Sequence, residues 1–319
     1  MPTKFTDDLR LAHVLADDAD SLTTSRYKAL DLHVVNKPDL TPVTDADKSV
    51  EEGIRRALSR ARPRDAVLGE EQGSTGFSQR RWVVDPIDGT KNFVRGVPVW
   101  ATLIALMVDD EVVAGCVSAP QLNRRWWASK GGGAWTGRSL LRATECHVSD
   151  VSGLDEASLS YSSLSGWEER DRLEDFMALS RRCWRTRAYG DFWSYMLVAE
   201  GAVDLAVEPE LEIYDMAALD VIVREAGGTF TSLDGTPGPT GGNALASNGR
   251  IHDQALAFLG SLPDDENDPD VTPRRGGSVH DISARRRNPP VDDPSAGRSG
   301  DPAGNPPGNP PGNPPGGHD

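Results

Sequence analysis

The chain has 319 residues and a formal net charge of −15 at pH 7, from 49 acidic and 34 basic side chains. This charge argues against nucleic acid as a partner, because binding a phosphate backbone requires a basic face. Its apolar runs are far shorter than the roughly 20 residues of a membrane-spanning helix. The first residues carry carboxylates where a signal peptide has a basic start and an apolar segment. We therefore expect a cytoplasmic protein with no membrane contact.

Composition changes once along the chain. From residue 263 onward the sequence is rich in Pro, Gly, Asp and Arg and ends in repeats of Asn-Pro-Pro-Gly. Such a segment cannot bury enough apolar surface to fold. We predict a globular domain at residues 1–262 and a disordered tail at residues 263–319. The 3 cysteines are widely spaced, and the 6 histidines show no metal-ligand spacing, so neither a disulfide framework nor a thiolate or imidazole metal site is indicated.

Helices and strands alternate irregularly within the globular part. Apolar side chains at helical spacing predict helices at residues 6–30 and 46–60, the second capped by Thr44 and Asp45. Strand patterns follow at residues 81–84, 102–108, 111–119 and 126–129, with Asp109-Asp110 as a hairpin turn. The later half predicts helices at residues 168–180, 193–201 and 214–227 and a strand at residues 202–208. This order favours an α+β fold or a layered αβαβα fold over a regular βαβ alternation.

Carboxylates gather in three short segments: Gly-Glu-Glu at 69–71, Trp-Val-Val-Asp-Pro-Ile-Asp-Gly-Thr at 82–90, and Tyr-Asp at 214–215. Pro86 biases Asp85 toward an extended conformation and Gly89 permits unusual backbone angles, so the turn between them can aim two Asp side chains the same way. Magnesium prefers such oxygen ligands, and clustered carboxylates need a cation or a proton to offset their repulsion. Each piece alone is typical of a solvated surface, a helix cap or a turn. Together they predict a hard-cation site.

These segments, read further as WVVDPIDGTKNF and EIYDMAALDVIVREAGG, resemble the signature segments of the inositol monophosphatase family over residues 5–258. The resemblance implies a layered αβαβα fold, a homodimer, and two or three Mg²⁺ ions per active site. By matched position it also implies a set of metal ligands. These are Glu70, Asp85, Asp88, Asp215 and the backbone oxygen of Ile87.

The resemblance further implies a catalytic set. Asp45, at the end of KPDLTPVTD, helps to hold the attacking water together with Glu70 and Thr90. The backbone N–H groups of Gly89 and Thr90 hold the phosphate at a helix start, where the dipole favours an anion. Water then attacks phosphorus in line without a covalent intermediate. The serine-rich run at residues 160–165 lacks a nucleophile elbow, which argues against a serine nucleophile.

The segment RAYGDFW at residues 187–193 departs from inositol phosphatases, which carry small or hydroxyl-bearing residues after the glycine. A carboxylate beside aromatic rings suits a cationic, partly flat substrate, with Asp191 and Glu208 near its ammonium. The alternative is an ion-paired Asp beside core aromatics. The predicted substrate-binding residues are Arg187, Asp191, Glu208 and Tyr214, with Tyr189, Phe192, Trp193 or Tyr214 facing the flat group.

Longer stretches, among them NFVRGVPVWATLIAL and RAYGDFWSY, resemble the actinobacterial histidinol-phosphate phosphatases within this superfamily. That resemblance implies hydrolysis of L-histidinol phosphate to L-histidinol and phosphate. Related alternatives are inositol 1-phosphate, fructose 1,6-bisphosphate or a 3′-phosphonucleotide; bisphosphates require extra basic residues, for which Arg187 is the obvious candidate. A different class of protein, a non-catalytic metal-binding regulator on the same fold, predicts an incomplete ligand set.

Overall fold

The computed structural model describes residues 3–36, 42–140 and 142–260. The predicted tail at residues 263–319 lies outside the described residues, so it stays a prediction. Within the described part no helix is both long and apolar enough to span a membrane. The strands form an eight-stranded sheet, a five-stranded sheet and a two-stranded sheet.

The eight-stranded sheet forms the base of the site, with strand order β10-β9-β8-β7-β6-β5-β3-β4. Its strands pair antiparallel except for β3 and β5, which are parallel. Asp109 and Asp110 adopt left-handed φ angles of 53° and 63° in the tight turn between β6 and β7, as a two-residue hairpin loop requires. The strand bounds are β3 Ala66–Gly69, β4 Gly73–Thr75, β5 Arg80–Asp88, β6 Ala101–Val108, β7 Glu111–Ala119, β8 Arg124–Ser129, β9 Ala134–Ser139 and β10 Arg142–Cys146.

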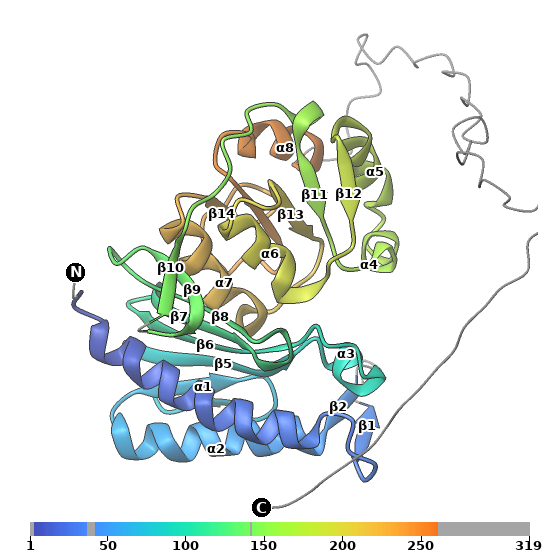
Figure 1. The fold of residues 1–319 in the computed structure, drawn as a ribbon. Coiled ribbons are helices and arrows are strands. Elements are labelled where there is room, and N and C mark those ends of the chain that lie inside the picture. The colour runs from blue at the N-terminus through green and yellow to red at the C-terminus, as the bar shows by residue number, and fades with distance from the viewer. Residues whose placement is uncertain (1–2, 37–41, 141, 261–319) are drawn as a thin grey trace, which may run out of the picture. The chain divides into compact units, whose positions relative to one another are not determined.

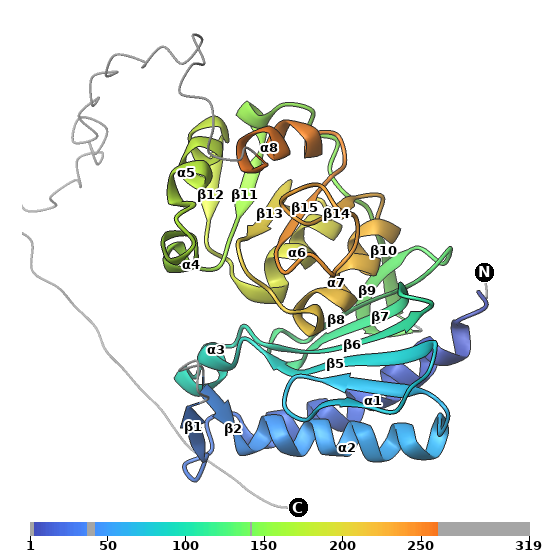
Figure 2. The ribbon, with the colours of Figure 1, turned by 180° about the vertical axis from the view of Figure 1, so that it is seen from behind.

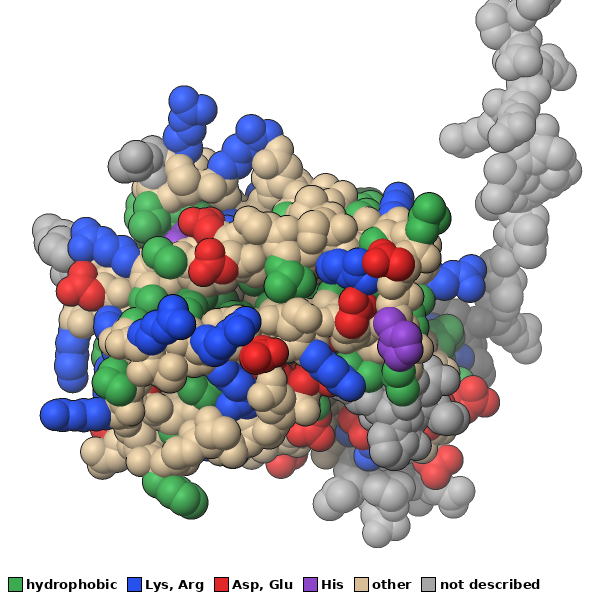
Figure 3. Space-filling model, turned by 90° about the horizontal axis from the view of Figure 1, so that it is seen from below, with side chains coloured by type: hydrophobic (Ala, Val, Ile, Leu, Met, Phe, Trp, Pro, Cys, Tyr) green, Lys and Arg blue, Asp and Glu red, His purple; other side chains and the backbone are tan. Residues whose placement is uncertain are grey.

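Helices α1 (Thr6–Arg26) and α2 (Asp45–Ala61) cover one face of this sheet (Figure 1). Their apolar stripes pack on Trp82 and Ile104 in one buried cluster, which is the main source of their stability because propensity alone contributes little. Thr44 caps α2 by accepting the N–H groups of Ala46 and Asp47, and Asp47 completes a capping box. The face on this side of the molecule carries both basic and acidic side chains (Figure 3).

The other face of the large sheet packs on α7 (Ile213–Glu225) and α6 (Asp191–Ala199), and beyond them lies the five-stranded sheet (Figures 1 and 2). Helix α7 is buried along most of its length because it lies between two sheets. The outermost layer holds α4 (Leu164–Glu169), α5 (Leu173–Arg182) and α8 (His252–Leu259). The strand order of the second sheet is β12-β11-β13-β15-β14. Its bounds are β12 Arg185–Arg187, β11 Ser158–Ser160, β13 Leu205–Glu208, β15 Ala244–Ser247 and β14 Thr229–Thr231. The predicted αβαβα layering is confirmed.

Smaller elements complete the fold. Strands β1 (Val34–Asn36) and β2 (Pro42–Thr44) form an antiparallel pair that leads into α2, and α3 (Thr90–Arg95) follows β5 directly. Short 3₁₀ turns lie at Pro120–Leu122 and Leu154–Glu156.

One predicted element was wrong. The single helix expected at residues 168–180 is instead two helices, because α4 ends at Glu169 and α5 begins at Leu173. Asp171 between them has a φ of 54°, a left-handed conformation that no continuous helix of L-residues tolerates. Residues 170–172 therefore form a turn between the two helices.

Candidate active site

Three chain segments bring carboxylates to one edge of the eight-stranded sheet. Because β3 and β5 run parallel, with Gly69 opposite Val84, the residues that follow them emerge at the same edge. Helix α7 begins beside this edge and carries Asp215 in its first turn. A carboxylate oxygen from each of Asp85, Asp88 and Asp215 lies within 4.8 Å of the others. The predicted convergence of these three side chains is therefore present.

Backbone N–H groups fix each of these carboxylates. The Ile87 N–H donates to Asp85 Oδ1 over 2.9 Å, and the Phe192 N–H donates to Asp88 Oδ2 over 2.7 Å. The N–H of Glu212 donates to Asp215 Oδ2 over 2.8 Å. The pairing of β5 with β6 is irregular between Asp85 and Asp88, and such an irregularity re-aims side chains at a sheet edge. Both Asp side chains of β5 are thereby directed to the cluster.

Several buried or half-buried carboxylates concentrate negative charge in this cluster. Burial raises the pKa of Asp85 and of Asp88 well above the ordinary range, and the neighbouring carboxylates raise both further. Burial, with the charges of Glu70 and Glu212, raises the pKa of Asp215 to about 7. Hard oxygen ligands held this close fit a divalent cation such as Mg²⁺, which removes the repulsion. The residues present therefore fit the predicted metal.

The turn between β5 and α3 joins the cluster to the predicted phosphate site. Gly89 has a φ of 83°, a left-handed conformation at the start of α3 that favours glycine. The Thr90 hydroxyl lies 2.9 Å from the Ile87 carbonyl oxygen and 3.4 Å from Asp47 Oδ1. Asp47 is buried, and burial raises its pKa to about 6. Thr90 thus has a carboxylate partner, and that partner is Asp47.

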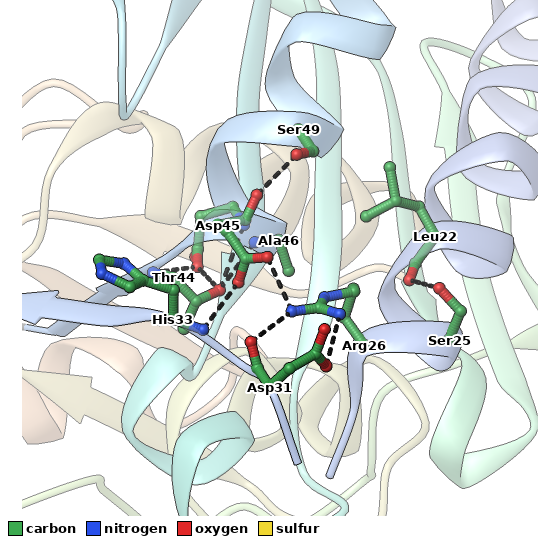
Figure 4. Close-up of polar contacts among 10 residues, drawn as sticks. Leu22, Ser25, Arg26, Asp31, His33, Thr44, Asp45, Ala46 and Ser49 are labelled. Atoms are coloured by element: carbon green, nitrogen blue, oxygen red, sulfur yellow. Dashed lines mark hydrogen bonds and ion pairs between the residues drawn. The ribbon is translucent and has the colours of Figure 1, made fainter. Parts of the chain in front are cut away.

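Asp45, the residue predicted for this position, is engaged elsewhere (Figure 4). Its Oδ2 accepts a hydrogen bond from Arg26 Nη2 over 2.8 Å, and its Oδ1 accepts the His33 N–H over 3.2 Å. Asp45 is the first residue of α2 and Asp47 the third, so the two side chains leave the helix about 200° apart. The structure brings Asp47 to the site and leaves Asp45 outside it, which corrects the sequence prediction.

Two further predicted carboxylates are buried or half-buried, and one of them, Asp191, lies beside the Gly89 turn. Asp191 Oδ2 accepts a hydrogen bond from Asn92 Nδ2 over 2.9 Å, and a Cβ placed on Gly89 would lie 3.1 Å from the same oxygen. Burial raises the pKa of Asp191 to about 6, an effect that Lys91 opposes. Glu208 is buried at the end of β13, and burial raises its pKa to about 8 despite hydrogen bonds from Ser162. Asp191 is therefore close to the phosphate turn, and the charge of Glu208 interacts with that of Asp191.

The remaining predicted substrate residues differ in how far they are buried. Phe192 is fully buried and packs on Trp126, so its ring belongs to the core and faces no substrate. Tyr189 and Trp193 are half-buried and stack edge to face with centroids 5.7 Å apart. Tyr214 is half-buried, and its pKa is raised by burial and by Asp215. Arg187 is exposed at the end of β12 and donates to the neighbouring Thr186 carbonyl.

Sequence reasoning missed Asp47, although its signals are present. Thr44 and Asp47 have the spacing of a capping box. Asp47 also lies three residues before Val50 and four before Glu51. It shares the buried face of α2 with these two residues and with Ile54. The periodicity that located the helix therefore also pointed Asp47 inward.

Comparison with known proteins shows the family to which this chain belongs. The inositol monophosphatase family matches residues 8–261. The chain belongs to the inositol monophosphatase family. Among its relatives, a histidinol-phosphatase of Streptomyces coelicolor is 66% identical over 259 residues, covering 80% of this chain and 97% of the relative. A histidinol-phosphatase of Mycobacterium tuberculosis is 59% identical over 254 residues, covering 79% and 98%.

The fold agrees with solved structures of this family. An inositol monophosphatase from Zymomonas mobilis matches with a TM-score of 0.72 and 32% identity, over 81% of this chain and 99% of that one. The family and the fold expected from the sequence are thereby confirmed.

Replacing Asp88 with Asn tests the charge cluster. Asparagine keeps an oxygen for the Phe192 N–H but removes one negative charge, so we expect phosphatase activity to fall by at least about 100-fold. Folding raises the pKa of the Asp88 carboxyl, so the folded protein binds a proton more tightly there than the unfolded chain does. The free energy of unfolding of the metal-free protein therefore falls as the pH rises from about 4 through the raised pKa. In EDTA the variant should therefore melt above wild type, by more at pH 8 than at pH 5.

The matched control is Asp110→Asn, since Asp110 is exposed and lies in a turn. It should leave activity and the pH dependence of Tm unchanged. Full turnover by Asp88→Asn, or a lower Tm than wild type in EDTA at pH 8, would contradict the assignment.

Asp47→Asn and Asp45→Asn separate the two candidates on α2. We expect Asp47→Asn to lower kcat by about 10²-fold or more, the scale of a lost acid–base group. Asp45→Asn should change kcat less than about threefold, because it weakens only a partly exposed ion pair with Arg26. Steady-state kinetics and a melting curve for each variant decide the point, and a larger kcat loss for Asp45→Asn would return the role to that residue.

Proposed function

We propose that this protein is a Mg²⁺-dependent phosphatase that hydrolyses L-histidinol phosphate to L-histidinol and phosphate. The observation that carries the proposal is the Asp191 carboxylate against the Gly89 turn. In histidinol phosphate the ammonium is carried two carbons from the ester oxygen, so a carboxylate beside the phosphate turn can pair with it. A neutral polyol offers no cation at that point. The names of the two relatives at 66% and 59% identity support the same substrate.

The metal is assigned to the converging carboxylates. Glu70, Asp85, Asp88, Asp215 and the Ile87 carbonyl would hold Mg²⁺, which when bound neutralises phosphoryl oxygens, acidifies water and stabilises the leaving oxygen. The acidic residues supply the oxygen ligands that Mg²⁺ prefers. Every residue of the predicted ligand set is present in the sequence, which supports a catalytic role over a non-catalytic regulator on this fold.

The chain's own groups then orient the reaction. The N–H groups of Gly89 and Thr90 at the start of α3 hold the phosphate. Asp47 and Thr90, together with Glu70, orient the attacking water in line with the leaving oxygen. Asp47, whose Oδ1 lies 3.4 Å from the Thr90 hydroxyl, accepts the proton of that water. The oxygen of the water bonds to phosphorus as the bond from phosphorus to the ester oxygen breaks. The released alkoxide takes a proton from solvent to become L-histidinol, and Asp47 returns its proton to solvent.

The substrate's other end is assigned to the rim. Asp191 pairs with the ammonium, while Asn92 holds Asp191 Oδ2 in place. Glu208 is buried near enough to Asp191 for the two charges to interact, and we assign it to the same cationic end of the substrate. Tyr189, Trp193 or Tyr214 would face the imidazole. Arg187 is assigned to the outer rim on the resemblance alone.

A second candidate is hydrolysis of inositol 1-phosphate, which the structural match to an inositol monophosphatase favours. Both candidates share the metal site and differ at Asp191. The number of Mg²⁺ ions, the homodimer and the cytoplasmic location stay predictions from the sequence.

A substrate panel tests the proposal directly. Phosphate release is measured with Mg²⁺ and with EDTA on L-histidinol phosphate, inositol 1-phosphate, fructose 1,6-bisphosphate and 3′-phosphoadenosine 5′-phosphate. We expect the highest kcat/KM on histidinol phosphate and no release in EDTA. Preference for another ester would keep the phosphatase and reject the cationic pocket; no turnover on any ester would favour a regulator.

Asp191→Asn tests the cationic pocket within the enzyme. The amide keeps an oxygen for Asn92 but loses the charge, so KM for histidinol phosphate should rise about tenfold or more, as for a lost charge-assisted hydrogen bond. KM for inositol 1-phosphate, where it is a substrate, should change less than about twofold. Equal changes in KM for both esters would show that Asp191 does not bind the ammonium.

A further inference from the structure

A buried carboxylate outside the metal cluster contacts the loop that carries Glu70. Glu51 lies on α2, one helical turn after Asp47, and its side chain is fully buried. Its Oε2 accepts the Glu71 N–H over 2.7 Å, and its Oε1 accepts the Gln72 N–H over 3.1 Å. One carboxylate thus binds two consecutive backbone donors immediately after Glu70.

The same carboxylate also lies against the residue before Glu70. A Cβ placed on Gly69 would approach Glu51 Oε1 to 2.3 Å, closer than any real side chain allows. This contact gives a physical reason for glycine at that position. Glu51 therefore touches the chain on both sides of Glu70, at residue 69 and at residues 71 and 72.

Arg55 holds the Glu51 carboxylate and ties it to the far strand of the hairpin. Its Nε donates to Glu51 Oε1 over 2.7 Å and its Nη1 to Thr75 Oγ1 over 2.9 Å, while Nη2 donates to the Gly73 carbonyl. Both side chains of the pair are little exposed, at 11% for Arg55 and 0% for Glu51. The hairpin of β3 and β4 is thereby fastened to α2 at its turn.

Helix α2 contains its own control for this pair. Glu52 and Arg56 have the same (i, i+4) spacing one residue further on, but their side chains are 61% and 65% exposed and 3.7 Å apart. An exposed pair of this kind contributes little. A buried ion pair also adds little to the free energy of unfolding, because the cost of removing both charges from water offsets their attraction. The placement of Glu51 and Arg55 calls for another role.

We propose that Glu51 is a positioning residue for the metal site, which orients the Glu70 carboxylate by fixing the backbone from residue 69 to residue 72. Arg55 holds Glu51 in the orientation that allows this. The inference rests on the proposed function in one respect, namely that Glu70 is a metal ligand. Groups that hold the ligands of a metal tune its affinity, and their loss costs about 10–100-fold.

Mg²⁺ titration of the metal-free protein by calorimetry tests this without any substrate. Glutamine at position 51 keeps the size of the side chain but offers one accepting oxygen and turns an NH₂ group toward a backbone N–H. We expect Glu51→Gln to raise the Mg²⁺ Kd at least about tenfold and Glu52→Gln to change it less than twofold. The Mg²⁺ concentration for half-maximal activity should rise in parallel, while KM for histidinol phosphate at saturating Mg²⁺ stays near the wild-type value.

Glu70→Gln distinguishes the role of the metal ligand from the role of the positioning residue. If Glu70→Gln weakens Mg²⁺ binding and Glu51→Gln leaves it at the wild-type value, the positioning role is overturned while the metal site stands. If Glu70→Gln leaves binding unchanged, the ligand assignment fails and the positioning role fails with it. Should Glu51→Gln not fold, Arg55→Gln with Arg56→Gln as its control carries the same test, and unchanged Mg²⁺ binding in both would overturn the proposal.

Discussion

The mutual repulsion of buried carboxylates is the constraint on which this site depends. Asp85, Asp88 and Asp215 lie close enough to share a cation, and burial together with their neighbours' charges raises the pKa of each. Such a cluster costs free energy in the metal-free protein. The rest of the fold must therefore hold the acids in place. It does so from both sides of the eight-stranded sheet, with α2 on one face and α7 on the other.

Hydrogen bonds from backbone N–H groups hold these carboxylates in place. Asp85, Asp88 and Asp215 each accept one, and Glu51 accepts two. A main-chain donor is fixed by the secondary structure around it, so a carboxylate bound to it loses little further freedom. This arrangement links the position of these four acids to the sheet and helices that carry the donors, and it keeps the site rigid.

The substrate side of the site uses other side chains than the metal side, although α6 serves both through the Phe192 N–H that holds Asp88. Asp191 begins α6 with a left-handed φ of 48°, and Asn92 from α3 reaches its carboxylate. A non-glycine residue in this conformation is held there by its surroundings and often marks a functional position. The metal side belongs to the edge of the large sheet, whereas this rim lies where α3 meets α6. Specificity can thus change in the rim while the metal chemistry is retained.

The sequence by itself determined the family, through the resemblance of its signature segments, and the layered fold. It also located the segments that carry the acids, because strand and helix periodicity and the run at residues 82–90 are local signals. It also placed Thr44 as the cap of α2. It did not decide which acid of Thr-Asp-Ala-Asp faces the site, that Phe192 is core, or that residues 168–180 break into two helices. It gave no sign of the contact between Glu51 and the chain around Glu70. These depend on the rotation of a helix against a sheet and on contacts between segments far apart in the chain, which only the tertiary structure sets.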